Sequence, residues 1–325
     1  MRKLLILAFI ISLLMIMPHV YALQPNEDKP IVVVTISPLY LIAKEVIGSK
    51  AIIHVLAPAG VDPHSYSPTP RDVMLVSTCD LFICIGREEF LGQLPKPEHG
   101  LILSWDSWIK SGIYIKNDNP HYLWLYPPNA KILAYEIAKA MSLLDPQSSS
   151  YYITQAKLFS SKIDELNNWL KSVMSKCGGA NVILAGDHFE PLIEWMGLDI
   201  SYVIIRGHGG LPGPQRIKDA IIKAKNSKLI IASATQTEGY EGLYARQVSR
   251  ESGIPVVYLY GIPLSMNDTY IEFIKYNVMI IASHLESDAP HNPNSPIEGI
   301  SISLITLFAS ISIIEGLMIL RLKRG

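Results

Sequence analysis

The strongest constraint on the fold is a series of short, largely apolar segments that alternate with helical segments. Four of them precede one long helical segment and four follow it, at residues 31–36, 51–56, 81–85, 101–103, 182–185, 200–205, 229–232 and 256–259. Apolar runs of this length, alternating with helices, are typical of parallel strands buried on both faces. The sequence therefore predicts an α/β fold with two four-stranded parallel sheets.

The long segment between the two sets of strands is predicted to be a single helix. Residues 149–175 contain neither glycine nor proline, and apolar side chains such as Tyr152, Phe159 and Leu166 recur at helical spacing. At about 1.5 Å per residue such a helix is roughly 40 Å long, enough to contact two lobes. The predicted division is an N-terminal lobe at 29–146, a linking helix at 147–177 and a C-terminal lobe at 178–287.

Both ends of the chain are unusually apolar. Residues 1–22 carry two basic residues, an apolar centre and a small residue at the end, which is typical of a secretory signal peptide. After a linker at 288–298, residues 299–320 carry Glu315 as the one charge and are long enough for a transmembrane helix of roughly 33 Å. Basic residues follow at 321–324, and such residues stay on the cytoplasmic side. We therefore expect a cell-membrane protein with a single C-terminal anchor and an extracellular body.

The overall composition argues against two classes of protein. With 28 basic and 29 acidic residues, the chain has no surplus of positive charge for nucleic acid, so no nucleic-acid partner is expected. Three cysteines, Cys79, Cys84 and Cys177, are too few for a disulfide framework, and the first two flank one short strand. They are predicted to be buried thiols.

One histidine lies in a proline-stiffened turn at residues 60–70, between a predicted strand and a predicted helix. Thr69, Pro70 and Asp72 form the start of that helix as a capping box with proline at the first position. His64 therefore follows the carboxyl end of a strand, which is where open α/β sheets bind ligands. A neutral imidazole at this place is available to a metal ion.

Two further histidines occupy equivalent places. His121 lies in the loop after the strand at 101–103, and His188 directly follows the strand at 182–185. Since all three lie at the carboxyl ends of strands, one cleft between the lobes can collect them. Imidazoles from separate loops can form three corners of a tetrahedral zinc site. The sequence thus predicts His64, His121 and His188 as metal ligands.

The remaining histidines have simpler interpretations. His54 lies within a predicted strand, and His99, His284 and His291 lie in a loop, a late helix and the linker. His208 is different because it follows the second strand of the second lobe and is flanked by glycines. Its loop is either a ligand loop or a turn.

These motifs resemble a known family. The chain between residues 30 and 287 resembles the zinc/manganese solute-binding proteins of ABC transporters (ZnuA/TroA type, cluster A-I). The matching stretches are residues 33–39, 60–70 around His64, 119–124 with 129–130, and 186–189. The resemblance implies two α/β lobes bridged by one long helix, a divalent metal ion bound in the cleft, and His64, His121 and His188 as its ligands. It also implies a cognate ABC permease in the membrane as partner.

Two departures concern the fourth ligand. Ser233 and Tyr260 stand where members of the family commonly have acidic residues, and the His- and Asp-rich loop of many zinc-specific members is missing. The loss of both carboxylates favours Zn²⁺ over Mn²⁺, which prefers hard oxygen donors. The fourth position remains open to water, His208, Asp62, Asp187, Glu190 or Glu238.

The resulting prediction is a membrane-tethered, monomeric receptor that captures Zn²⁺, or a similar divalent metal ion, for uptake by an ABC transporter without covalent chemistry. One alternative is a zinc-dependent hydrolase, because three histidines with an open position can also activate water. The other is a surface or adhesion protein whose metal site has degenerated, since both expected carboxylates are replaced.

Overall fold

Two parallel sheets of the same topology organise the chain. The computed structural model describes residues 29–286, except positions 176, 178 and 208–210. The strand order is β2-β1-β3-β4 in the first sheet and β6-β5-β7-β8 in the second. Their bounds are Ile31–Ile36 (β1), Ile52–Ala57 (β2), Leu81–Ile83 (β3), Leu101–Leu103 (β4), Asn181–Gly186 (β5), Asp199–Ile205 (β6), Leu229–Ser233 (β7) and Val256–Leu259 (β8). The predicted pair of four-stranded parallel-sheet lobes is confirmed, and the lobes are named N-terminal and C-terminal below.

The burial of the central strands explains the apolar runs in the sequence. In β1, Val32, Val33 and Val34 are completely buried, and Val33 pairs with His54 of β2 on one side and Phe82 of β3 on the other. Helices cover both faces of such a sheet, so inward and outward side chains are both apolar. His54 accordingly belongs to the sheet and is half-buried.

Helices alternate with the strands, as predicted. They are α2 (Ser37–Ile47), α3 (Pro70–Thr78), α4 (Trp105–Lys110), α5 (Tyr122–Leu125), α6 (Pro127–Leu144), α7 (Ser149–Met174), α8 (Glu190–Met196), α9 (Pro214–Ala224), α10 (Tyr240–Ser252) and α11 (Tyr270–Glu286). The capping box of α3 is present, with Thr69 and Asp72 bonded reciprocally. No helix was predicted at α4 or α5, because six and four residues are too few to show a helical period.

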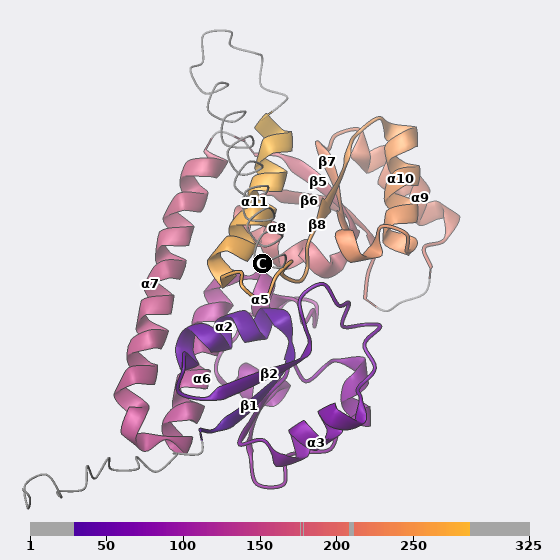
Figure 1. Ribbon diagram of the computed structural model, residues 1–325. Coiled ribbons are helices and arrows are strands. Elements are labelled where there is room, and N and C mark those ends of the chain that lie inside the picture. Colours follow the sequence, from indigo (N-terminus) through magenta and orange to yellow (C-terminus); the bar gives the residue numbers. More distant parts are fainter. Residues whose placement is uncertain (1–28, 176, 178, 208–210, 287–325) are drawn as a thin grey trace, which may run out of the picture. The chain divides into compact units, whose positions relative to one another are not determined.

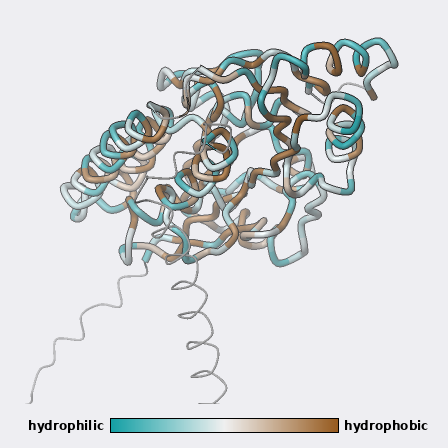
Figure 2. The backbone as a smooth tube through the Cα atoms, turned by 90° about the horizontal axis from the view of Figure 1, so that it is seen from above, coloured by the Kyte–Doolittle hydropathy of each residue, from teal (hydrophilic) through white to brown (hydrophobic). Residues whose placement is uncertain are grey.

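The long helix α7 contacts elements of both lobes. It packs against α2 and α6 of the N-terminal lobe, and Figure 1 shows it running beside that lobe and toward α8 and α11. Trp195 of α8 donates to Asn167 of α7 at 2.7 Å, and the ring of Phe159 lies 5.6 Å from that of Tyr270 in α11. Along the helices the tube in Figure 2 alternates between hydrophobic and hydrophilic, as one buried face requires.

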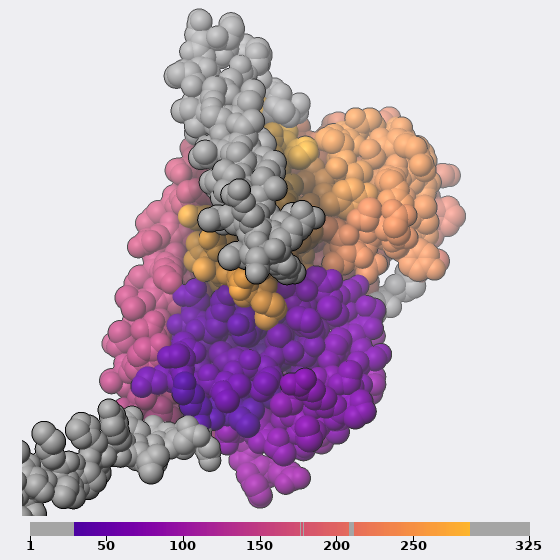
Figure 3. Space-filling model, viewed as in Figure 1, coloured from indigo at the N-terminus to yellow at the C-terminus, as the bar shows by residue number. Residues whose placement is uncertain are grey.

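Direct contacts also join the two lobes. Trp124 donates through Nε1 to the carbonyl of Gly261 at 2.7 Å, and the hydroxyl of Tyr270 donates to the carbonyl of Trp124 at 2.7 Å. Lys44 of α2 donates to the carbonyl of Met266 at 2.9 Å. The described residues up to Ser283 therefore belong to one compact unit. Within it, Figure 3 shows the N-terminal lobe in purple and the C-terminal lobe in orange.

Three predicted segments lie outside the described residues: the signal peptide at 1–22, the linker at 288–298 and the transmembrane helix at 299–320. Among the helices that the structure does describe, none combines the length and the apolar character needed to cross a bilayer.

Candidate metal-binding site

The three predicted histidines meet between the lobes. The ring centroids of His121 and His188 are 4.5 Å apart, those of His64 and His188 are 5.8 Å apart, and those of His64 and His121 are 6.3 Å apart. One ring nitrogen from each lies within 4.8 Å of the other two. Nitrogen ligands about 2.0–2.1 Å from a tetrahedral Zn²⁺ are roughly 3.4 Å apart, so a small inward shift of the rings would give them one common ion.

His64 lies on the exposed side of this cluster, in the loop that follows β2. The backbone N–H of His64 donates to Oδ1 of Asp62 at 3.0 Å, which fixes the turn. Oδ2 of Asp62 accepts from Gln236 of the other lobe at 3.2 Å. The loop that carries His64 is therefore tied to the C-terminal lobe next to the site.

His121 is positioned by a turn with two left-handed residues. Asn117 and Asp118 have φ angles of 55° and 54°, which asparagine and aspartate tolerate better than most residues. Oδ1 of Asn119 accepts from the backbone N–H of His121 at 3.0 Å and lies 2.8 Å from its Nδ1. Nδ2 of Asn119 donates to the carbonyl of Asp187 at 2.8 Å, which links this turn to the C-terminal lobe. Because Nδ1 has a partner, Nε2 is the nitrogen of His121 that is placed to serve as a ligand.

His188 lies in a single 3₁₀ turn, Asp187–Phe189, directly after β5. Its Nδ1 is buried and lies 2.5 Å from Oε1 of Glu241, although the ring is not turned into line for a straight hydrogen bond. Burial disfavours the charged imidazolium, but the carboxylates of Glu241, Asp187 and Asp62 outweigh burial and raise the pKa of His188. Burial likewise disfavours the Glu241 carboxylate, yet its contact with His188 lowers the pKa of Glu241. The two side chains therefore stabilise each other's charged form.

The histidines open into a cleft of about 570 Å³. Acidic side chains dominate the charged groups of its wall, with Asp62, Glu89 and Asp187 among them, and Arg87 is the one lysine or arginine among the described residues that line it. Arg87 is itself paired with Asp118 at 3.2 Å. A cleft of this charge attracts cations and raises their local concentration.

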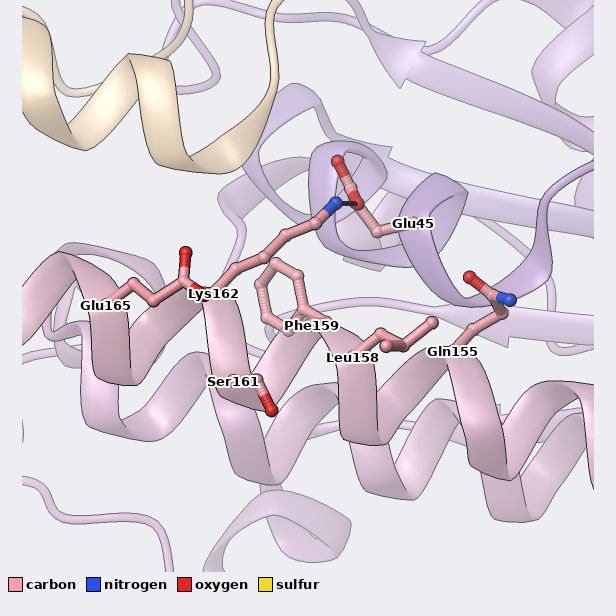
Figure 4. Close-up of a pocket in the computed structure, with 7 residues that line it drawn as sticks. All are labelled: Glu45, Gln155, Leu158, Phe159, Ser161, Lys162 and Glu165. Atoms are coloured by element: carbon pink, nitrogen blue, oxygen red, sulfur yellow. Dashed lines mark hydrogen bonds and ion pairs between the residues drawn. The ribbon is translucent and has the colours of Figure 1, made fainter.

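A second, smaller pocket of about 350 Å³ lies between α2 and α7 (Figure 4). Its polar side chains include Glu45 and Lys162, which form an ion pair at 2.7 Å across it. Its lining contains neither histidine nor cysteine, and helices rather than the carboxyl ends of strands form it. The cleft with the three histidines is therefore the candidate functional site.

The structure also places the side chains considered for the fourth position. Ser233 is buried at the end of β7 and lines the cleft, whereas the ring of Tyr260 packs on Tyr276 at 5.7 Å. Glu190 is buried and accepts from Asn117 at 3.2 Å, and the side chain of Glu238 is 91% exposed. His208 lies outside the described residues. Among the positions that the structure covers, the cluster able to hold a metal ion consists of the three histidines without a carboxylate.

Two residues next to the histidines were missed at the sequence level, Asn119 and Glu241. Asn119 belongs to the same short motif as His121, two positions earlier, so its proximity could have been inferred. Glu241 lies in the first turn of α10, which follows β7. An acidic residue in the first turn of a helix that follows a parallel strand lies at the carboxyl edge of the sheet. This position was the signal by which Glu241 could have been found from the sequence.

Two α/β lobes, a long connecting helix and a histidine cluster between the sheet ends define the class of two-lobed solute-binding proteins. A solved structure of the solute-binding protein FpvC from P. aeruginosa, in complex with Ni²⁺, has the same fold, with a TM-score of 0.67 and 21% sequence identity over 81% of this chain and 99% of that one. The chain belongs to the ZnuA family, described as zinc-uptake complex component A, periplasmic, whose family model matches residues 32–284.

Curated relatives agree with this membership. The metal ABC transporter substrate-binding lipoprotein SloC of Streptococcus mutans is 24% identical over 282 residues, which cover 80% of this chain and 91% of SloC. The manganese ABC transporter substrate-binding lipoprotein PsaA of Streptococcus pneumoniae is 25% identical over 283 residues, which cover 80% of this chain and 90% of PsaA. The family description and these names refer to different metals. The similarity therefore defines the class of protein but not the identity of the metal ion, which has to be argued from the residues of the site.

Proposed function

We propose that this protein is the extracytoplasmic metal-binding component of an ABC transporter, and that it captures Zn²⁺ with His64, His121 and His188. The observation that carries the proposal is the convergence of one ring nitrogen from each histidine within 4.8 Å in a cleft between two lobes. Since the lobes contribute two and one of these ligands, the ion connects them when it binds.

The donor set supports Zn²⁺ over Mn²⁺ as the cargo. Neutral imidazoles suit Zn²⁺, whereas Mn²⁺ prefers carboxylate and carbonyl oxygens. The positions where acidic ligands were expected hold Ser233 and Tyr260, and the ring of Tyr260 packs against Tyr276. A three-nitrogen site leaves the fourth corner of a tetrahedron to water.

Membrane attachment and the permease complete the proposal. The apolar segment at 299–320 would hold the monomeric receptor at the outer face of the membrane, where tethering raises its effective concentration near the permease. The family is described as a component of an uptake complex, which fits capture and release of a metal ion better than it fits hydrolysis. We therefore do not propose an enzymatic function.

Calorimetric titration of the full-length, chelator-treated protein with Zn²⁺ tests the ligand set. Replacing any one of His64, His121 and His188 by alanine should weaken Zn²⁺ binding strongly. Losing an outer-shell partner typically costs about 10–100-fold in affinity, and losing a ligand should cost more than that. His99→Ala, which removes an exposed histidine of a loop, is the matched control and should bind like the wild type. Unchanged affinity in all three ligand variants would remove the proposal.

A further inference from the structure

Glu241 is a buried carboxylate with both oxygens held at the edge of the site. Its side chain is 7% exposed, and Oε1 lies 2.5 Å from Nδ1 of His188. Oε2 accepts a hydrogen bond from the backbone N–H of Ser233 at 3.0 Å. A buried charge persists only when it is paired and hydrogen-bonded, and Glu241 meets both conditions here.

The space that this carboxylate occupies exists because residue 186 is glycine. Gly186 ends β5, and a Cβ atom at this position would overlap Oε1 and Cδ of Glu241 and lie 3.1 Å from Nδ1 of His188. The backbone of Gly186 has an ordinary extended conformation with φ of −130°. Room for Glu241, and not backbone strain, is therefore what requires glycine.

We propose that Glu241 is the positioning residue of the metal site, acting on the ion through His188, and that Gly186 provides the space for it. The inference rests on the proposed function. A carboxylate that accepts from one ring nitrogen of a histidine fixes its tautomer and orientation and makes the other nitrogen a stronger ligand. Nδ1 of His188 lies beside Glu241, and a small turn of the ring would align the hydrogen bond between them. Nε2 is then the nitrogen of His188 left for a metal ion.

This arrangement compensates for the missing acidic ligands. The side chain of Ser233 cannot supply a negative charge. Its backbone N–H instead donates a hydrogen bond to the Glu241 carboxylate, which keeps that negative charge beside the site. Glu241 does not join the cluster of ligand atoms formed by the three histidines. It therefore contributes charge and orientation without a metal–oxygen bond, which preserves a nitrogen-only set of protein ligands.

Four variants of the full-length protein test the proposal: Glu241→Gln, Glu241→Ala, Gly186→Ala and the double variant Gly186→Ala/Glu241→Ala. Zn²⁺ affinity is measured by competition with a chromogenic chelator. Glu241→Gln and Gly186→Ala should each weaken binding by about 10–100-fold, the usual effect of losing an outer-shell partner. In the Glu241→Ala background, Gly186→Ala should have little further effect, because the added methyl group then has no carboxylate to displace.

The control variant is Glu238→Gln, whose side chain is 91% exposed, and it should bind like the wild type. Imidazole ¹⁵N shifts of His188 supply a second readout, since Glu241→Gln should change the tautomer population without unfolding the chain. The proposal is overturned when Glu241→Gln binds Zn²⁺ like the wild type, or when Gly186→Ala is equally harmful in both backgrounds. Failure of the wild type to bind Zn²⁺ would instead refute the proposed function.

Discussion

Glu194 of α8 forms a polar contact between the lobes, and its hydrogen bonds define what it contributes to stability. Its Oε1 accepts from the hydroxyl of Tyr114 at 2.7 Å, and its Oε2 accepts from the hydroxyl of Tyr122 at 2.6 Å. Lys116 lies 3.3 Å from Oε2 with its side chain 48% exposed. Replacement by glutamine keeps the shape of the side chain and removes its charge.

The expected loss follows from the two hydroxyl contacts. Hydrogen bonds to a charged group contribute about 1.5–3 kcal/mol, and neutral ones contribute about 0.5–1.5 kcal/mol. The exposed Lys116 pair adds little. Glu194→Gln should therefore lower the free energy of unfolding by about 2 kcal/mol, which corresponds to a decrease in Tm of about 4–8 °C for a unit of this size. Glu194→Ala should cost about 1–3 kcal/mol more, because Tyr122 is completely buried and its hydroxyl would lose its partner.

The effect should depend on pH in a defined direction. Burial opposes ionisation of Glu194, but hydrogen bonds from Tyr122, Tyr114 and Lys116 outweigh burial and lower the pKa of its carboxyl group. A carboxyl group whose pKa is lower in the folded than in the unfolded state stabilises the protein above the unfolded-state pKa, and this contribution is lost as the pH falls through the folded-state pKa. The difference between wild type and Glu194→Gln should therefore be full at neutral pH and shrink in acid.

Thermal and urea unfolding of the full-length protein, followed by circular dichroism at several pH values, provide the measurement. Glu165→Gln is the matched control because this glutamate is exposed on α7, and surface substitutions of this kind usually change stability by less than about 0.5 kcal/mol. A decrease in the free energy of unfolding of Glu194→Gln no larger than that of the control, or one that grows as the pH falls, would contradict this account of the contact.

Two further predictions concern the site and the thiols. Asn119→Ala should weaken Zn²⁺ binding by about 10–100-fold in a calorimetric titration. The variant frees the ring of His121 and removes the hydrogen bond to the carbonyl of Asp187. Unchanged affinity would show that Asn119 does not orient the ring. Burial raises the pKa of the Cys79 thiol to about 11, whereas Cys177 is half-buried. Treatment with iodoacetamide at neutral pH, followed by mass spectrometry, should therefore show Cys177 alkylated well before Cys79. The reverse order would contradict the argument from burial.

Much of the fold could be predicted from local sequence patterns. The strands were recognisable because a parallel strand covered on both faces must be apolar throughout, and α3 was recognisable because Thr69 and Asp72 cap it through contacts three residues apart. The long helix was recognisable from its uninterrupted period. By contrast, α5 has four residues and is formed where the turn after Asn119 packs against neighbouring elements, so no period reveals it.

The candidate site divides in the same way. The sequence alone showed that His64, His121 and His188 follow predicted strands, and parallel strands bring their carboxyl ends to one edge of each sheet. That the two edges face each other, and that Glu241 reaches His188 through the space beside Gly186, became evident from the packing of the folded chain. The difference is one of distance along the chain. A strand period is encoded within a few residues, whereas the contact of Glu241 with His188 depends on how α10 packs beside β5 in the C-terminal lobe, and the meeting of the three histidines depends on how the two lobes pack.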